Sequence, residues 1–186
     1  MKILCLNGSP RKKGNTAKIA ERFCETAEIL GSEVKIVALR KLKYQGCTAC
    51  GACKKKSEKC VLKDDLSVIL KKMDKYDVVV FGSPVYYGDL CSQMKAFIDR
   101  TYSYLTSDYK SRLTPGKTLV MILPQGDTDE KHFADIFPRY FEFFKWYGFK
   151  DGYSIRACGA DEKDGKTMEK ALKEAEELAA KISMAK

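Results

Sequence analysis

The regular alternation of short apolar runs with segments of helical period is the feature that most constrains the fold of this chain. The apolar runs that we interpret as strands occupy residues 3–6, 33–39, 77–81, 117–123 and 153–157. Segments with apolar residues at helical spacing follow them, at residues 16–30, 66–73, 89–102, 133–147 and 167–184. This alternation predicts an α/β fold, a doubly wound five-stranded parallel sheet.

The run at 77–81 is the most hydrophobic of the expected strands. Its apolar residues are continuous instead of alternating, which indicates burial on both faces and a central place in a parallel sheet. A chain of 186 residues can bury one sizeable core and is short for two domains. We therefore expect a single domain over residues 1–186.

The loop after the first strand has the composition of a phosphate site. The backbone N–H groups at a helix N-terminus have no intrahelical partner and lie at the positive end of the helix dipole, so they favour an anion. The loop adds hydrogen-bonding and cationic side chains and a glycine that lets the backbone close around an anion: Ser9, Arg11, Lys12, Gly14, Asn15 and Thr16. A solvated basic turn is the alternative interpretation.

Two better-known phosphate motifs are excluded here. A P-loop needs four residues between its glycines, whereas five separate Gly8 from Gly14, and Asn15 stands where the lysine should be. The dinucleotide fingerprint G-x-G-x-x-G is absent. The loop therefore suits one terminal phosphomonoester, as in a mononucleotide.

Three loops should meet at the carboxyl edge of the predicted sheet, where ligands bind in doubly wound folds. They are residues 9–16, residues 83–88 and residues 124–127. The first suits phosphate, the second is aromatic with prolyl and glycyl turns, and the third is polar. This set fits a ligand with a phosphate at one end and a flat ring at the other.

The sequence N-G-S-P-R-K-K-G-N-T at residues 7–16, together with G-S-P-V-Y-Y-G at residues 82–88, resembles the NADPH-dependent FMN reductase branch of flavodoxin-like proteins. The resemblance implies a flavodoxin-like fold, FMN as cofactor and an oxidoreductase in which N5 of the flavin carries the chemistry, with no catalytic side chain. The cofactor-binding residues that it implies are Ser9, Arg11, Lys12, Gly14, Asn15, Thr16, Pro84, Val85, Tyr86, Tyr87, Gly88, Gln125 and Gly126.

A cysteine-rich insertion, the loop at residues 44–63, follows the second expected strand. It carries the spacing C-x2-C-x2-C-x6-C at Cys47, Cys50, Cys53 and Cys60, and within the reductase branch it resembles the iron–sulfur flavoproteins. The resemblance implies a 4Fe-4S cluster, for which four thiolates on one short loop are suitable ligands. Zinc and free or redox-active thiols remain open as alternatives.

The other cysteines, Cys5, Cys24, Cys91 and Cys158, fall in expected strands or helix faces, and we expect them to be buried small hydrophobic residues. The single histidine, His132, has no nucleophile motif beside it, so we expect a surface residue.

The chain carries a net charge of +9, with basic clusters at residues 11–13, 40–43 and 54–56. No cluster has the spacing of a nucleic-acid-binding motif, so we expect no nucleic-acid partner. No apolar run approaches the ~20 residues of a membrane span, and the first residues lack a signal-peptide core. We expect no membrane partner and a cytoplasmic protein.

Two function hypotheses follow. The first is an FMN oxidoreductase that takes electrons from NAD(P)H or from reduced ferredoxin and passes them to a small-molecule or protein acceptor. The basic residues 54–56 would suit an acidic ferredoxin. The second is a flavin-binding carrier or redox sensor without turnover. The resemblance implies a homodimer or homotetramer, and the aromatic segment at residues 102–109 could bury against a second copy.

Overall fold

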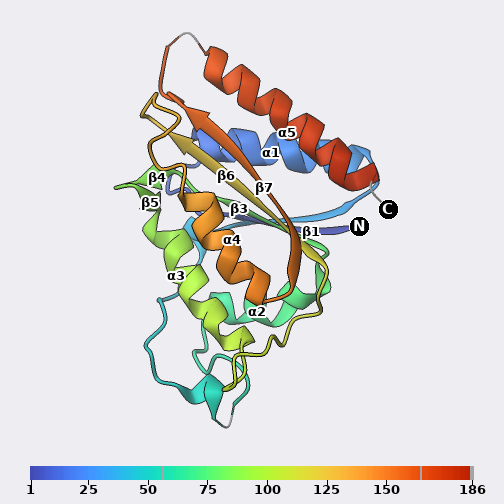
Figure 1. Ribbon diagram of the computed structural model, residues 1–186, viewed down its shortest axis with the longest axis vertical. Coiled ribbons are helices and arrows are strands. Elements are labelled where there is room, and N and C mark those ends of the chain that lie inside the picture. The colour runs from blue at the N-terminus through green and yellow to red at the C-terminus, as the bar shows by residue number, and fades with distance from the viewer. Residues whose placement is uncertain (56, 164, 185–186) are drawn as a thin grey trace.

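A parallel sheet of five strands forms the centre of the molecule (Figure 1). The computed structural model describes residues 1–55, 57–163 and 165–184. The strand order is β2-β1-β3-β6-β7, and every neighbouring pair in this sheet is parallel. The strands are β1 (Lys2–Asn7), β2 (Glu33–Ala38), β3 (Val78–Gly82), β6 (Lys117–Gln125) and β7 (Phe149–Cys158). This confirms the predicted doubly wound α/β fold, with the order 2-1-3-4-5 of flavodoxin-like sheets.

Helices cover both faces of the sheet (Figure 1). One face packs against α1 (Asn15–Ile29) and α5 (Lys166–Met184), and the other against α2 (Asp65–Lys72), α3 (Ser92–Thr101) and α4 (Ile136–Trp146). Short 3₁₀ turns lie at Leu39–Lys41, Ala52–Lys54, Met73–Lys75 and Tyr102–Tyr104. In the part of the chain that the structure describes, no helix is long and apolar enough to cross a membrane.

Strand β1 shows why the expected strands read as continuous apolar runs. Leu4 and Leu6 point into the core beneath α2, α3 and α4, while Ile3 and Cys5 point into the core beneath α1 and α5. Successive side chains of a strand face opposite sides, so both sets must be apolar when helices cover both faces.

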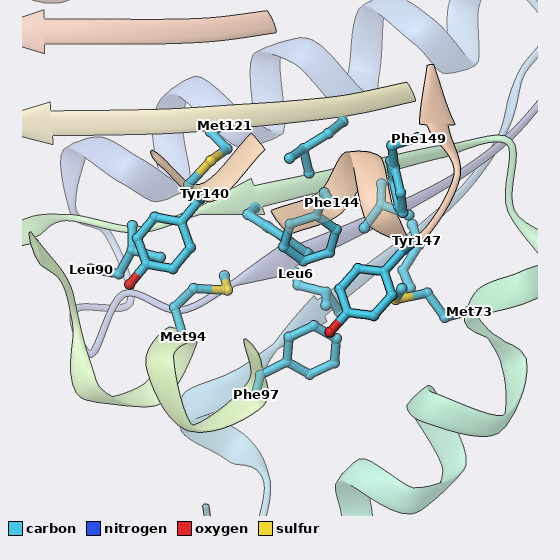
Figure 2. Packing of buried hydrophobic residues seen from close by; sticks show 14 of the residues in the cluster. Leu6, Met73, Leu90, Met94, Phe97, Met121, Tyr140, Phe144, Tyr147 and Phe149 are labelled. Carbon is cyan, nitrogen blue, oxygen red and sulfur yellow. The ribbon is translucent and has the colours of Figure 1, made fainter. Parts of the chain in front are cut away.

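The core beneath α3 and α4 is rich in aromatic rings (Figure 2). Phe144 of α4 packs edge-on against Phe81, with ring centroids 5.1 Å apart, and against Phe149, at 5.2 Å. Phe97 of α3 contacts the same Phe81 ring at 5.8 Å. These contacts fix α3 and α4 on the sheet and so set the position of the loops that precede them.

The structure differs most from the expectation at three element boundaries. Residues 85–90 form a hairpin of two short strands, β4 (Val85–Tyr86) and β5 (Asp89–Leu90), so α3 begins at Ser92 and not at residue 89. Helix α4 begins at Ile136 and not at residue 133, because Phe133 has a left-handed backbone with φ +61°. Strand β7 begins at Phe149, four residues before the expected start.

The N-terminus of α2 is fixed by a capping box. The Ser67 backbone N–H donates to Asp64 Oδ1 at 3.2 Å, and the Asp64 N–H donates to Ser67 Oγ at 2.8 Å. Two otherwise unpaired donors are satisfied in this way. The capping box also ends the cysteine-rich loop at a defined position.

Candidate functional site

The loops predicted to meet at the carboxyl edge of the sheet do so, around a cavity of about 90 Å³. Residues of the first loop, of hairpin β4–β5 and of the end of β6 line this cavity, and the turn after β7 closes it. The lining residues are Ser9, Arg11, Gly14, Asn15, Thr16, Pro84, Val85, Tyr86, Pro124, Gln125, Gly126, Ala160 and Asp161. We call it the edge cavity.

Three of the predicted cofactor-binding residues do not line the edge cavity. Lys12 lines a separate groove beside β2. Tyr87 is fully exposed at the tip of the hairpin, with φ +50°. Gly88 lies beneath the Phe133 ring, where an added Cβ would come within 2.9 Å of a ring carbon, and its φ of +72° favours glycine.

The predicted cofactor-binding residues omit three lining residues: Pro124, Ala160 and Asp161. Ala160 and Asp161 follow β7, and the Ala160 carbonyl accepts a hydrogen bond from Asn15 Nδ2 at 2.7 Å. This bond ties the first loop to the turn after β7. The signal that was available is topological, since the loop after the fifth strand reaches the same edge as the loops after the others.

The first loop has the geometry of an anion cradle. Ser9 is 3% exposed, its N–H donates to Asn7 Oδ1 at 2.9 Å, and its Oγ accepts from the Arg11 N–H at 3.2 Å. Helix α1 starts after Gly14, which has no side chain to cap it, and no acidic residue lies in its first turn. The positive end of α1 therefore faces the cavity, and the carboxylate that lines the same cavity is that of Asp161, whose Oδ1 lies 3.5 Å from Asn15 Nδ2.

Close backbone approach explains Gly8 at the base of this loop. Its N–H donates to the Gly82 carbonyl at 2.7 Å, which joins the ends of β1 and β3. An added Cβ would lie 2.9 Å from Met94 Cβ, so a larger residue would push α3 away from the sheet.

On the other side of the cavity, Gln125 is held by its neighbours. Its Nε2 donates to the Asp127 carbonyl at 3.2 Å, and its Oε1 accepts from Arg156 Nη2 at 3.1 Å. Arg156 also donates to the carbonyls of Glu130 and His132, both at 2.7 Å. The loop after β6 is thus wrapped around one guanidinium that the sequence interpretation did not identify.

His132 is an exposed residue, as predicted. Its Nδ1 lies 2.8 Å from Asp127 Oδ2, and its Nε2 lies 3.8 Å from Asp129 Oδ2. The hydrogen bond with Asp127 raises the pKa of His132 above the usual 6.5, and the same bond lowers the pKa of Asp127 below 3.8. No nucleophilic side chain is among its partners in the described chain.

The cysteine-rich loop forms a second candidate site at the far end of α3. Cys47, Cys50, Cys53 and Cys60 all line one cavity of about 800 Å³ between this loop and α3 and α4. We call it the cysteine cavity. The Arg100 Nε–H donates to Cys60 Sγ at 3.1 Å, and a hydrogen bond from the backbone of Ala52 lowers the pKa of Cys50.

Four thiols on one cavity, with N–H donors beside three of them, fit a thiolate-bound metal centre in their chemistry. The sulfurs are not brought together as ligands, however. Among the described residues, no group of three or more His, Cys, Asp or Glu side chains is arranged to hold a metal ion. The 4Fe-4S cluster therefore stays a prediction, as do zinc and free thiols.

The expected basic surface at residues 54–56 is not a free cluster of lysines. Lys54 Nζ donates to the carbonyls of Tyr102 and Leu105, both at 2.5 Å, and lies 3.6 Å above the Tyr102 ring. Burial lowers the pKa of Lys54. Lys55 is exposed, and Lys56 lies outside the described residues. Lys54 is thus a structural clamp on the cysteine-rich loop.

Three of the remaining cysteines are buried as predicted. Cys5, Cys24 and Cys91 are at most 1% exposed, and the Cys91 thiol donates to the Gly8 carbonyl at 3.1 Å. Cys158 differs, because it is only half-buried at the end of the edge strand β7. The expected aromatic segment is also divided: Tyr104 is buried in the chain's own core, while Tyr109 is exposed.

Comparison with known proteins gives one family and several relatives. A family model described as NADPH-dependent FMN reductase matches residues 1–134. An iron-sulfur flavoprotein of Archaeoglobus fulgidus is 40% identical over 104 residues, which cover 56% of this chain and 47% of that relative. An iron-sulfur flavoprotein of Methanosarcina thermophila is 39% identical over 101 residues, 54% of this chain and 52% of the relative. The chain thus spans about half the length of the curated relatives it matches.

Solved structures share the fold at low sequence identity. An NAD(P)H:quinone oxidoreductase from Methanothermobacter marburgensis has a TM-score of 0.81 at 17% identity, and the match covers 98% of both chains. An FMN-dependent NADH-azoreductase from Bacillus anthracis, solved in complex with FMN, has a TM-score of 0.78 at 19% identity, over 98% of this chain and 100% of that chain.

Proposed function

The chain belongs to the NADPH-dependent FMN reductase family, and on this premise we propose that it is an FMN-dependent oxidoreductase of the iron–sulfur flavoprotein type. NAD(P)H is the proposed electron donor, with reduced ferredoxin as the second candidate. The observation that carries the proposal is the edge cavity, where the anion cradle of α1 faces a proline- and tyrosine-bearing hairpin. We propose a single domain, because one sheet joins both cores.

In this proposal the first loop binds the FMN phosphate. The backbone N–H groups at the start of α1 and the Arg11 guanidinium supply the positive charge, and Ser9 and Thr16 supply hydroxyl groups. Asn15 contributes its backbone, because its side-chain amide is bonded to the Ala160 carbonyl. The cavity is compact, so the phosphate would be held largely out of water.

The ring of the cofactor would lie against Pro84 and against Val85 and Tyr86 of the hairpin, with Gln125 and Gly126 on the opposite side. Bound FMN supplies an electron carrier that accepts two electrons and can release them singly. The protein residues orient the ring and exclude water from one face. The Gln125 side-chain amide is held by hydrogen bonds at both its Nε2 and its Oε1. The orientation of this side chain is therefore fixed before the cofactor binds.

We propose further that the thiols of the cysteine-rich loop bind a 4Fe-4S cluster, which would carry one electron at a time. Cys47, Cys50, Cys53 and Cys60 would be the ligands. Support comes from their common cavity and from the names of the relatives that the chain matches. Zinc or free thiols are the alternatives that the test below separates.

The two proposed sites lie at opposite ends of α3. The hairpin leads into the N-terminus of this helix, and Arg100 near its C-terminal end contacts Cys60. A helix of ten residues is about 15 Å long. Such a separation favours an arrangement in which a second copy of the chain brings its own site closer, so we propose a homodimer or homotetramer.

Anaerobic purification tests the proposed function. We expect a brown-yellow protein with about one FMN and about four irons per chain, whose flavin absorbance bleaches on addition of NADPH or NADH. Bleaching only with a reduced ferredoxin would identify the second donor. A yellow protein that no donor bleaches would support the carrier or sensor, and a colourless protein that contains zinc would contradict the proposal.

A further inference from the structure

Arg100 is buried far more deeply than an arginine usually is. It is 1% exposed, although it carries a full charge. A buried charge is tolerated only where partners replace its water. Its main partner is Asp64: Nη1 donates to Oδ2 at 2.7 Å and Nη2 donates to Oδ1 at 3.1 Å, a bidentate pair.

The remaining donors of Arg100 reach the same segment of the chain. Nη1 also donates to the Gln45 carbonyl at 2.9 Å, and Nε donates to Cys60 Sγ at 3.1 Å. Gln45 stands two residues before Cys47, and Asp64 stands four residues after Cys60. One guanidinium therefore joins the beginning and the end of the segment that carries the four thiols.

Hydrogen bonds from backbone N–H groups join the same two ends of the loop. The Lys43 N–H donates to Asp65 Oδ2 at 2.7 Å, the Asp65 N–H donates to the Lys43 carbonyl at 3.3 Å, and the Gln45 N–H donates to Asp64 Oδ2 at 3.4 Å. Asp64 thus serves both as the cap of α2 and as the acceptor for Arg100. Since Arg100 belongs to α3, it ties this closed base to the core, together with Tyr44, whose hydroxyl donates to the Gln93 carbonyl of α3 at 2.9 Å.

We propose that Arg100 is the positioning residue of the cysteine-rich loop. Its planar fork closes the base of the loop against α3, and its Nε–H holds the Cys60 sulfur toward the cysteine cavity. The role of Arg100 toward the Cys60 sulfur rests on the proposed cluster, while its role in closing the base of the loop does not. A lysine could keep the charge but not the fork, because its ammonium group cannot reach carboxylate, carbonyl and sulfur in one plane.

Two consequences distinguish this role from an ordinary buried ion pair. Hydrogen-bond donors to a ligand sulfur raise the reduction potential of an iron–sulfur cluster. Residues that orient metal ligands typically change metal affinity 10- to 100-fold when they are replaced. Loss of the Arg100 fork should therefore change both the potential and the retention of iron.

The test compares Arg100→Lys with a matched control, Arg139→Lys. Arg139 lines the same cavity and pairs with Asp89, but it makes no hydrogen bond or ion pair with the described residues of the cysteine-rich loop. In metal-free protein we expect amide hydrogen exchange over residues 45–55 and 57–64 to be at least ~10-fold faster in Arg100→Lys than in the unaltered chain. Exchange in α1 and α5 should not change, and the control should match the unaltered chain.

In protein purified with its iron, Arg100→Lys should lose iron to a chelator 10- to 100-fold faster than the control. A redox titration followed by electron paramagnetic resonance should give a lower potential. Asp64→Asn separates the closing of the loop from the contact with the sulfur. This variant breaks the ion pair with Arg100 but leaves the Arg100 Nε–H beside Cys60. We expect faster exchange in this variant without a lower potential.

The proposal is overturned if Arg100→Lys matches Arg139→Lys in exchange and in iron release. Should Arg100→Lys fail to fold by circular dichroism, the exchange of Asp64→Asn decides, and exchange equal to that of the unaltered chain overturns the loop-closing role. Iron absent from the unaltered chain would refute the proposed cluster and the sulfur-holding half together. The hydrogen-exchange measurement would still decide whether Arg100 closes the base of the loop.

Discussion

Two neighbouring basic side chains, Arg11 and Lys12, have different places in the structure. Arg11 lines the edge cavity, while Lys12 lines the groove beside β2. Composition alone made both candidates for the phosphate, because a loop sequence does not say which way each side chain points.

Arg11→Ala should weaken FMN binding about tenfold or more, since a hydrogen bond to a charged group contributes about 1.5–3 kcal/mol. Lys12→Ala should change the dissociation constant less than about threefold, in line with weak interactions of exposed charges. Fluorescence titration of the FMN-free proteins measures both values. Equal losses of FMN affinity in the two variants would contradict the proposed role of Arg11 in binding the phosphate.

The His132–Asp127 pair predicts a pH-dependent contribution to stability. The pKa of His132 is raised above 6.5, so its contribution is complete below 6.5 and is lost as the pH rises through the folded value. The pKa of Asp127 is lowered below 3.8, so its contribution is present above 3.8 and is lost as the pH falls through the folded value. The pair therefore stabilises the loop after β6 between these limits.

Thermal unfolding of the unaltered chain and of His132→Gln tests this window. The difference in melting temperature should be largest near pH 5 and should shrink above the raised histidine pKa. A difference that is constant from pH 5 to pH 9 would show that the ion pair does not contribute.

Some residue roles could not be predicted from the sequence. Arg100 lies in an amphipathic helix, and nothing in its neighbours indicates that its guanidinium is buried against a loop 36 to 55 positions away. Arg156 was missed for the same reason. Long-range partners of a polar side chain depend on how the elements pack, which local pattern does not contain. The loop proposed to bind phosphate could be identified from the sequence because its residues are local to one strand–helix junction.

Among the elements, the hairpin β4–β5 could not be predicted from the sequence pattern. Strands of two residues are too short to show a period, so residues from 89 onward were assigned to the following helix. The long elements were predicted well, because their apolar periodicity extends over several turns or over a whole buried strand. The expected start of α4 was three residues too early, because Phe133 has a left-handed backbone, and its ring lies against Gly88 of the hairpin.

Gly88→Ala should destabilise the hairpin for two reasons. Its φ of +72° is unfavourable for alanine, and the new Cβ would lie 2.9 Å from the Phe133 ring. Gly116→Ala is the control, because its φ is +95° and no atom lies within 4 Å of the added Cβ. Backbone strain should cost about 1 kcal/mol in both variants, and overpacking should add about 1–3 kcal/mol in Gly88→Ala.

Urea unfolding measures these free energies, and FMN titration provides a second readout. We expect weaker FMN binding in Gly88→Ala only, because this residue holds the hairpin beside the edge cavity. If Gly116→Ala is destabilised as much as Gly88→Ala, the contact with Phe133 contributes nothing measurable.

At the scale of the whole molecule, sheet topology determines where the chemistry lies. The order β2-β1-β3-β6-β7 brings the loops after β1, β3 and β6 to one edge, with the turn after β7 beside them. This convergence was predictable, since parallel strands with right-handed crossovers leave few alternatives. The position of the cysteine-rich loop at the other end of α3 could not be predicted. An insertion without hydrophobic periodicity does not indicate which elements it packs against.

The proposed function depends on binding of a mononucleotide through its phosphate in the edge cavity. A titration of the FMN-free protein with FMN and, in parallel, with riboflavin tests this binding, because riboflavin has the same ring but no phosphate. We expect one FMN per chain, bound at least about tenfold more tightly than riboflavin, because charged and backbone donors would hold the phosphate. Equal affinities for the two ligands, or no binding of FMN, would contradict the proposal.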